Sequence, residues 1–226
     1  MCDQNLARLL RRPRRTVIVA IDGPGGSGKS TVSQQLAKRL GWNHLDTGAF
    51  YRAATLAALR EGVDPADEES VVKAVADRHF DQQRGRMFLD GEDVSSAIRT
   101  QEVTAAVSAV AAHPGLRRHL VREQRKWVEG KGRNTVVEGR DIGTVVFPDA
   151  KLKVWLMASP TERARRRARE TGVDLGEVEA DLARRDRADS GRAVSPQRQA
   201  ADAVHLDTTG LSVETVVQRI LALLGP

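Results

Sequence analysis

The residues best suited to chemistry are those that run GPGGSGKS at positions 23–30. They match the phosphate-binding pattern G-x-x-x-x-G-K-[ST], and they lie between the β-branched run TVIVAID and a helical stretch. Glycines let backbone N–H groups curve around an anion, and a helix N-terminus adds unsatisfied donors. In such a loop Lys29 reaches the β- and γ-phosphates and the Ser30 hydroxyl binds Mg²⁺. The residues predicted to bind the phosphates of a nucleotide such as ATP are Gly23, Pro24, Gly25, Gly26, Ser27, Gly28, Lys29, Ser30 and Thr31.

This loop alone leaves kinases, GTPases, ATPase motors and transporter subunits open. A GTPase would be expected to carry N-K-x-D for guanine, but none of Asn5, Asn43 and Asn134 precedes a lysine. An ATPase motor usually needs a longer chain. A compact transferase is therefore the leading class.

The segment LDTGAFYR at 45–52 follows the second predicted strand directly. In a doubly wound sheet this position faces the phosphate loop across the crevice at the strand ends. Arg52 can present a bidentate donor fork to an incoming phosphate. Thr47 either lines that site or caps the helix that starts there, and the two roles are compatible.

A second polar edge follows the strand at 135–138, which ends in Glu138. Gly139 permits a tight turn, after which Arg140 and Asp141 project adjacent charges. Such charges at the end of a buried strand are costly unless they meet ligands or each other. The sequence leaves a site edge and a structural Arg–Asp pair both open.

Short apolar strands alternate with helices along the chain. The expected strands are 16–22, 43–46, 135–138, 152–157 and 203–207, and the expected helices are 30–40, 48–60, 160–171, 175–188 and 212–224. This alternation predicts an α/β fold with a doubly wound, five-stranded parallel sheet. Residues 63–132 break the rhythm: the turns within 80–94 indicate antiparallel strands, and helices are expected over 99–112 and 115–129. We interpret 63–132 as an insertion over the carboxyl edge of the sheet.

The 226-residue chain has 36 Lys plus Arg residues against 30 Asp plus Glu, a net charge of +6, and most of the cations are Arg. Arg suits phosphate recognition, but the aromatic content of 4% is low for stacking on single-stranded nucleic acid. The single Cys excludes a disulfide framework, and no apolar run is long enough for a membrane helix. We expect a cytoplasmic monomer without nucleic-acid or membrane partners, in which the basic residues 1–15 form a disordered tail ahead of the domain at 16–226.

Five segments, in order, resemble bacterial cytidylate (CMP/dCMP) kinases: IDGPGGSGKST, LDTGAFYR, DGEDVSSAIRTQEV, EGRDIGTVVFPDA and RRDRADSGRAVSP. The resemblance covers about residues 16–224, and the third and fourth segments make it specific. It implies a P-loop nucleoside monophosphate kinase that transfers the γ-phosphoryl group of ATP to CMP or dCMP with Mg²⁺. It further implies that 63–132 binds the monophosphate and that 160–192 forms an Arg-rich lid.

The resemblance assigns recognition of the base to Ser108, Arg117 and Asp141. A carboxylate can accept from the N4 amino group of cytosine, while Arg or a hydroxyl donates to O2 and N3. Uracil has an acceptor where cytosine has N4, so the same site would reject it. The other implied CMP-binding residues are Thr47, Arg52, Arg140, Arg185, Asp189 and Arg192. Lys29, Arg140 and Arg192 are the expected catalytic cations, and Arg163 and Arg167 are expected lid cations.

Two other functions stay open at this point. One is a P-loop kinase for another small acceptor, such as UMP, AMP or shikimate. The other is a basic nucleic-acid-binding ATPase, for which the Arg-rich stretch 162–192 would be the binding stripe.

Overall fold

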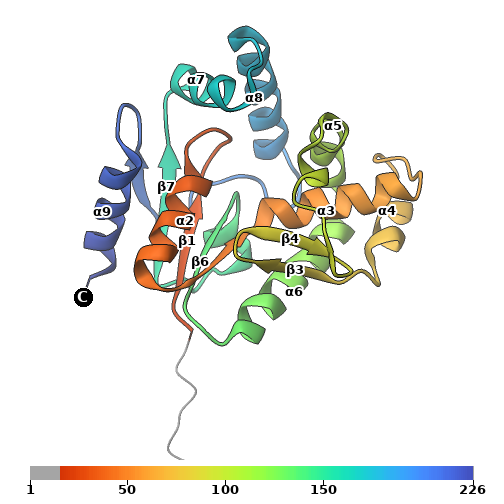
Figure 1. Cartoon of the computed structure of the whole chain (residues 1–226), viewed down its shortest axis with the longest axis horizontal. Coiled ribbons are helices and arrows are strands. Elements are labelled where there is room, and N and C mark those ends of the chain that lie inside the picture. Colours follow the sequence, from red (N-terminus) through yellow and green to blue (C-terminus); the bar gives the residue numbers. More distant parts are fainter. Residues whose placement is uncertain (1–15, 226) are drawn as a thin grey trace, which may run out of the picture.

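The computed structural model describes residues 16–225 and contains a five-stranded parallel sheet (Figure 1). Its strands lie in the order β2-β6-β1-β7-β8. Their bounds are β1 Ile18–Asp22, β2 Asn43–Asp46, β6 Thr135–Gly139, β7 Leu152–Met157 and β8 Val204–Asp207. The predicted α/β fold and the five predicted strands are confirmed, with ends that shift by one or two residues. The predicted tail at 1–15 lies outside the described residues.

Helices cover both faces of this sheet, because the buried strands are apolar on both sides. In β1, Val19 and Ile21 pack against α2 (Lys29–Leu40) and α9 (Val213–Leu224). Ala20, between them, faces the core that includes α3 (Thr47–Arg60) and α6 (Pro114–Lys131). Each buried Val or Ile side chain contributes about 1.5–3 kcal/mol of transfer free energy, so β1 is held firmly from both sides.

The insertion holds a second, three-stranded antiparallel sheet, which confirms the predicted antiparallel strands. Its strands are β3 Phe80–Gln83, β4 Arg86–Leu89 and β5 Glu92–Asp93. The Phe80 ring stacks on Phe50 of α3 with 5.8 Å between the ring centroids. The insertion therefore shares a hydrophobic core with the parallel sheet.

Two helices of the insertion differ from the prediction. Helix α4 (Glu68–Val75) was not predicted, although Asp67 caps it by accepting from the backbone N–H groups of Glu69 and Ser70. The single helix predicted over 99–112 is present but is two residues shorter at each end. A 3₁₀ turn at Ala97–Arg99 comes first, and Thr100 then caps α5 (Gln101–Val110).

Helices α7 (Pro160–Thr171) and α8 (Leu175–Ser190) form a pair beyond the carboxyl end of β7 (Figure 1). A small apolar cluster of Ala164, Val178 and Leu182 holds the two helices together. The pair sits at the same end of the sheet as the loops that leave β1, β2 and β6, so the functional residues of all these segments can meet there. In the described part of the chain, no helix has the length and apolar character needed to cross a membrane.

Candidate active site

The loop 23–30 connects β1 to α2 as the motif requires. Gly28 caps α2 with φ of 89°, a left-handed backbone conformation that glycine adopts without steric strain. The buried Lys29 ammonium donates to the Pro24 carbonyl at 2.7 Å and to Ser27 Oγ at 3.4 Å. Burial, and then the nearby positive charge of Arg140, lower the pKa of Lys29 to about 7. The loop therefore holds a lysine whose charge a bound anion would stabilise.

Ser30, the last residue of the motif, contacts the end of β6. Its hydroxyl donates to Glu138 Oε2 at 2.8 Å, and His44 Nε2 lies 3.0 Å from Glu138 Oε1. Glu138 is also beside Asp46 in the register of β2 and β6. A hydroxyl and a carboxylate, both hard oxygen ligands, thus meet at the start of α2.

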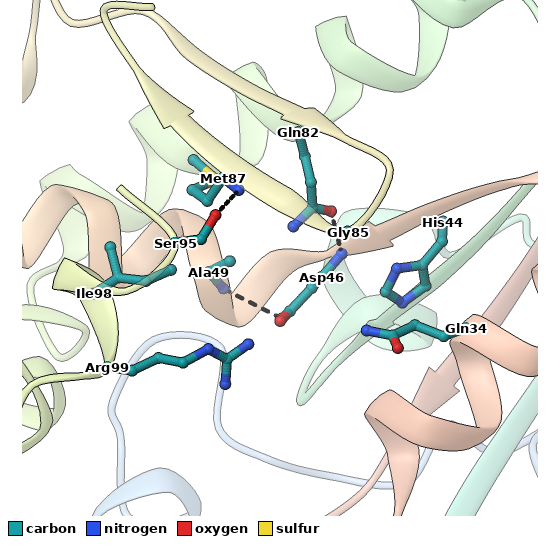
Figure 2. Close-up of a pocket in the computed structure, with 10 residues that line it drawn as sticks. All are labelled: Gln34, His44, Asp46, Ala49, Gln82, Gly85, Met87, Ser95, Ile98 and Arg99. Atoms are coloured by element: carbon teal, nitrogen blue, oxygen red, sulfur yellow. Dashed lines mark hydrogen bonds between the residues drawn. The ribbon is translucent and has the colours of Figure 1, made fainter. Parts of the chain in front are cut away.

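Asp46, at the end of β2, caps α3 by accepting from the Ala49 N–H at 3.2 Å (Figure 2). Its own N–H donates to Gln82 Oε1 at 2.8 Å, which ties the hairpin to β2 (Figure 2). The interpretation of Thr47 as the cap is therefore wrong. Thr47 is the first residue of α3, and its hydroxyl donates to the Glu138 carbonyl at 2.7 Å. The small pocket in Figure 2, of about 10 Å³, has room for little more than a water molecule.

Arg117 of α6 and Asp141, which follows β6, form a buried ion pair. Arg117 Nη2 donates to Asp141 Oδ2 at 2.6 Å, and the side chains are 3% and 5% exposed. The Arg117 guanidinium also lies 5.0 Å from the ring centroid of Tyr51, a cation–π contact. Burial opposes the charge of Arg117, but Tyr51 and Asp141 outweigh it and raise the pKa of Arg117.

Arg140 and Arg192 converge on one carboxylate, that of Asp189. Arg140 Nε donates to Asp189 Oδ2 at 3.1 Å, and Arg192 Nη2 donates to Asp189 Oδ1. Burial lowers the pKa of Arg192, although Asp189 acts in the opposite direction. Two cations from distant segments are thus held side by side by a single acid. The group of three keeps a net positive charge, which can attract an anion.

These groups line one large cavity of about 950 Å³. Most of the predicted site residues line it: Gly25, Gly26, Ser27, Gly28, Lys29, Ser30, Thr31, Thr47, Arg52, Ser108, Arg117, Arg140, Asp141, Arg167, Arg185, Asp189 and Arg192. The phosphate loop, the Arg117–Asp141 pair and the two arginines on Asp189 therefore share one space.

The comparisons with known proteins agree with this geometry. A family model described as cytidylate kinase matches residues 19–225. The chain belongs to the cytidylate kinase family. A relative from Mycobacterium leprae, named cytidylate kinase, is 51% identical over 212 residues, covering 92% of this chain and 95% of the relative. A cytidylate kinase from Azotobacter vinelandii is 48% identical over 219 residues, with coverage of 92% and 95%.

Among solved structures, an uncharacterised protein from Eubacterium ventriosum has a TM-score of 0.52 at 12% identity. The match covers 92% of this chain and 98% of that chain, and it shows a shared fold. As a member of the cytidylate kinase family, the chain is a nucleotide kinase and acts on small nucleotide substrates by ATP-dependent phosphoryl transfer.

Three of the predicted site residues, Gly23, Pro24 and Arg163, do not line the cavity. Gly23 is pressed against β7, where a Cβ atom would lie 2.1 Å from the Leu156 carbonyl oxygen, and Pro24 gives its carbonyl to Lys29. Arg163 is buried in an ion pair with Asp186 at 2.6 Å. It acts as a bridge between α7 and α8 rather than as a cation open to ligand.

Arg52 lines the cavity, but its guanidinium already donates hydrogen bonds to the insertion. Its Nη1 donates to the Ile98 carbonyl at 3.1 Å and to Thr104 Oγ1 at 3.0 Å. Burial, and then the positive charge of Arg185, lower the pKa of Arg52 to about 10. An anion placed between these arginines would relieve their mutual repulsion.

The α7–α8 pair contacts the phosphate loop directly. Arg163 Nη1 donates to the Gly25 carbonyl at 3.0 Å. Arg166 donates to the Ser27 carbonyl at 3.4 Å and to the Thr208 carbonyl at 2.7 Å. Two arginines of α7 thus hydrogen-bond to the backbone of the loop 23–30.

Sequence reasoning missed several residues that line the cavity, among them Tyr51, Arg99 and Arg166. Tyr51 lies four residues after Thr47, on the same face of α3. Tyr51 is also the single Tyr of the chain, so its type together with this spacing was a usable signal. Arg99 and Arg166 had no signal that set them apart from the other arginines of the chain.

Proposed function

We propose that the protein transfers the γ-phosphoryl group of ATP to CMP or dCMP by in-line attack within the 950 Å³ cavity. One observation carries the proposal: the phosphate loop and the buried Arg117–Asp141 pair line the same cavity. The first suits a triphosphate, and the second suits the edge of a cytosine. Membership of the cytidylate kinase family supports the same reaction.

The donor triphosphate lies along the loop 23–30, where backbone N–H groups and the N-terminus of α2 face its oxygens. Lys29 exchanges the Pro24 carbonyl for the β- and γ-phosphates, and those negative charges raise its pKa from about 7 so that it stays protonated. The role of Lys29 is to neutralise charge as it develops on the transferred group.

Mg²⁺ fits the oxygen pair of Ser30 and Glu138, which lie 2.8 Å apart at the start of α2. Mg²⁺ prefers oxygen ligands and is usually bound through one or two protein groups together with phosphates and water. Ser30 is the direct ligand in this proposal, and Glu138 orients its hydroxyl. When bound with ATP at Ser30, the ion would neutralise negative charge on the phosphates.

The acceptor base lies against Arg117, Asp141 and Ser108. The Asp141 carboxylate accepts from the cytosine N4 amino group, and the guanidinium and hydroxyl donate to O2 and N3. A uracil O4 atom would instead face the Asp141 carboxylate, so UMP would leave buried polar groups unpaired. The buried ion pair therefore favours cytosine over the other small acceptors.

The acceptor phosphate binds among Arg52, Arg140 and Arg192, while Arg185 and Asp189 hold the sugar. The Asp189 contacts fix Arg140 and Arg192 in position before the ligand arrives. The attacking phosphate oxygen is already anionic near neutral pH, so no general base is needed. Positioning and charge neutralisation are what these residues supply.

The domain organisation belongs to the same proposal. Residues 63–132 form the monophosphate-binding insertion, and 160–192 form a lid that closes over both nucleotides and excludes water. Arg167 supplies a cation from the lid, and Arg163 anchors the lid to the phosphate loop. The cytoplasmic location, the monomeric state and the lack of a nucleic-acid partner stay predictions.

A coupled assay of ADP release against CMP, dCMP, UMP, AMP and shikimate tests the proposal. We expect kcat/KM for CMP or dCMP to exceed that for UMP by at least about 100-fold, because two buried polar contacts distinguish the bases. A higher kcat/KM for UMP or AMP would contradict the assignment of the base site.

A further inference from the structure

The turn that carries Asp141 has an unusual cap. Asp141 is the N-cap residue of the π-helix Ile142–Val146, yet its side chain makes no capping hydrogen bond. An Asp in this position ordinarily accepts from an N–H group of the first turn. Here its carboxylate contacts Arg117 instead.

A second acid, Asp22, fills the capping role from another strand. Its Oδ1 accepts from the Ile142 N–H and its Oδ2 from the Gly143 N–H, both at 2.8 Å. Asp22 is the last residue of β1 and is 5% exposed. Both carboxylate oxygens are therefore directed at the turn, 120 and 121 residues further along the chain.

The turn is also held on its other side. A Cβ atom at Gly143 would lie 3.0 Å from Lys153 Cδ and 3.5 Å from Asp22 Oδ2. The Lys153 ammonium is fixed in turn by Asp202 at 2.8 Å. The backbone at Gly143 thus fits between Asp22 and Lys153, with little room to move.

We propose that Asp22 is a positioning residue for recognition of the acceptor base. By accepting from the first two N–H groups of the π-helix, Asp22 leaves the Asp141 carboxylate free to face Arg117 and the base. Asp22 does not line the cavity, so it acts through Asp141 and not by touching substrate. This inference rests on the proposed function, in which Asp141 accepts from cytosine N4.

The replacement Asp22→Asn tests the proposal with almost no change in side-chain volume. An amide has one acceptor oxygen, so its NH₂ group must face one of the two N–H donors. Asp141 is then expected to turn back and cap its own helix. We expect the ratio of kcat/KM for CMP to that for UMP to fall at least about tenfold, towards the value of Asp141→Asn.

Asp207→Asn is the matched control. Asp207 also ends a parallel strand and accepts from a loop N–H, that of Thr209 at 2.8 Å, but it has no contact with the 142–146 turn. This variant should keep the CMP/UMP ratio. In the double variant Asp22→Asn/Asp141→Asn, the ratio should fall no further than in Asp141→Asn alone, because both changes remove the same carboxylate from the base.

A crystal structure of Asp22→Asn supplies a readout that does not depend on activity. The proposal predicts that the Asp141 carboxylate accepts from the Gly143 or Thr144 N–H and separates from Arg117. If Asp22→Asn does not fold, Asp22→Ser, which also removes the paired acceptors, is measured in the same ways.

Two results would overturn the inference: an unchanged CMP/UMP ratio in Asp22→Asn when Asp141→Asn lowers it, or an Asp141 carboxylate that stays on Arg117 in the crystal structure. Failure of the proposed function looks different, because Asp141→Asn itself would then keep the CMP/UMP ratio. In that case the proposed role of Asp22 in base recognition is wrong as well. The crystal structure still decides whether Asp22 sets the orientation of Asp141.

Discussion

Arg117 Nη2 lies 2.6 Å from Asp141 Oδ2 in an ion pair that is almost completely shielded from water. Removing one partner of such a pair leaves an uncompensated buried charge, which costs about 3–5 kcal/mol. Both partners keep free hydrogen-bonding capacity: Arg117 Nε has no partner in the described structure, and Asp141 Oδ1 makes no capping bond. A base that donates to the acid and accepts from the arginine can use this capacity without separating the charges.

Asp141→Asn should weaken discrimination between CMP and UMP, because the new amide can present a donor to uracil O4. We expect kcat/KM for CMP to fall by about 10²-fold and its ratio to the UMP value to fall at least tenfold. The coupled ADP assay measures both. If the ratio does not change, Asp141 is only a structural partner of Arg117.

Lys29 should take up a proton when a triphosphate binds. With a pKa of about 7 in the free protein, roughly half of the molecules carry the charged form at pH 7, and the phosphates draw the rest to that form. Calorimetric titrations in buffers with different ionisation enthalpies should show an uptake of about half a proton at pH 7. The same uptake in Lys29→Arg, whose side chain is always charged, would disprove this origin.

Lys29→Ala should abolish phosphoryl transfer while the fold survives. The side chain hydrogen-bonds only within the loop, to Pro24 and Ser27, so its loss removes no hydrogen bond between elements. Circular dichroism and thermal melting report the fold, and the coupled assay reports turnover. Normal turnover in this variant would exclude the proposed role of Lys29.

Gly139→Ala should destabilise the protein by roughly 2–3 kcal/mol through overpacking. The new Cβ atom would lie 2.5 Å from Thr47 Oγ1 and 2.6 Å from Ile142 Cδ1, and both of these residues are buried. Gly130→Ala is the control, because nothing lies within 4 Å of its Cβ position on α6. It should stabilise the helix by about 0.5–1 kcal/mol. Chemical denaturation that gives the two variants equal stability would contradict the steric argument.

The contribution of Asp22 to the stability of the protein should fall as the pH rises from about 4 to about 6. Burial raises the pKa of Asp22 from 3.8 to about 6, against the opposing effect of the Gly143 and Ile142 N–H groups. Between these values the folded protein holds a proton that the unfolded chain has lost, so the penalty for the buried charge grows with pH and is complete above pH 6. It amounts to about 3 kcal/mol. Comparing unfolding of the wild type and Asp22→Asn across this range isolates the effect; parallel curves would refute it.

The strands and most helices could be predicted because local patterns determine them. The apolar run before Gly23 and the spacing of Val32 and Leu36 in α2 each specify an element without long-range information. Helix α4 was missed because it is only eight residues long, although the Asp67 cap and the acidic Glu68 and Glu69 in its first turn are signals of a helix start.

The partners of the site residues could not be predicted in the same way. That Asp46 caps α3 while Thr47 reaches the Glu138 carbonyl depends on the pairing of β2 with β6. The occupation of Arg52 by Ile98 and Thr104 depends on how the insertion packs against α3. Such contacts join residues far apart in the chain, and periodicity carries no information about them.

The sheet order also has a consequence for the way the chain acquires its structure. Strand β1 lies between β6 and β7, so nearly all of its partners emerge from the ribosome long after it does. Until then, TVIVAID is an unpaired and strongly apolar strand, which is a site for aggregation during synthesis. Hydrogen bonds such as that from the Ile142 N–H to Asp22, across 120 residues, give the fold a high contact order and predict slow folding. The phosphate loop, although it is encoded near the start of the chain, is therefore among the last parts to become rigid.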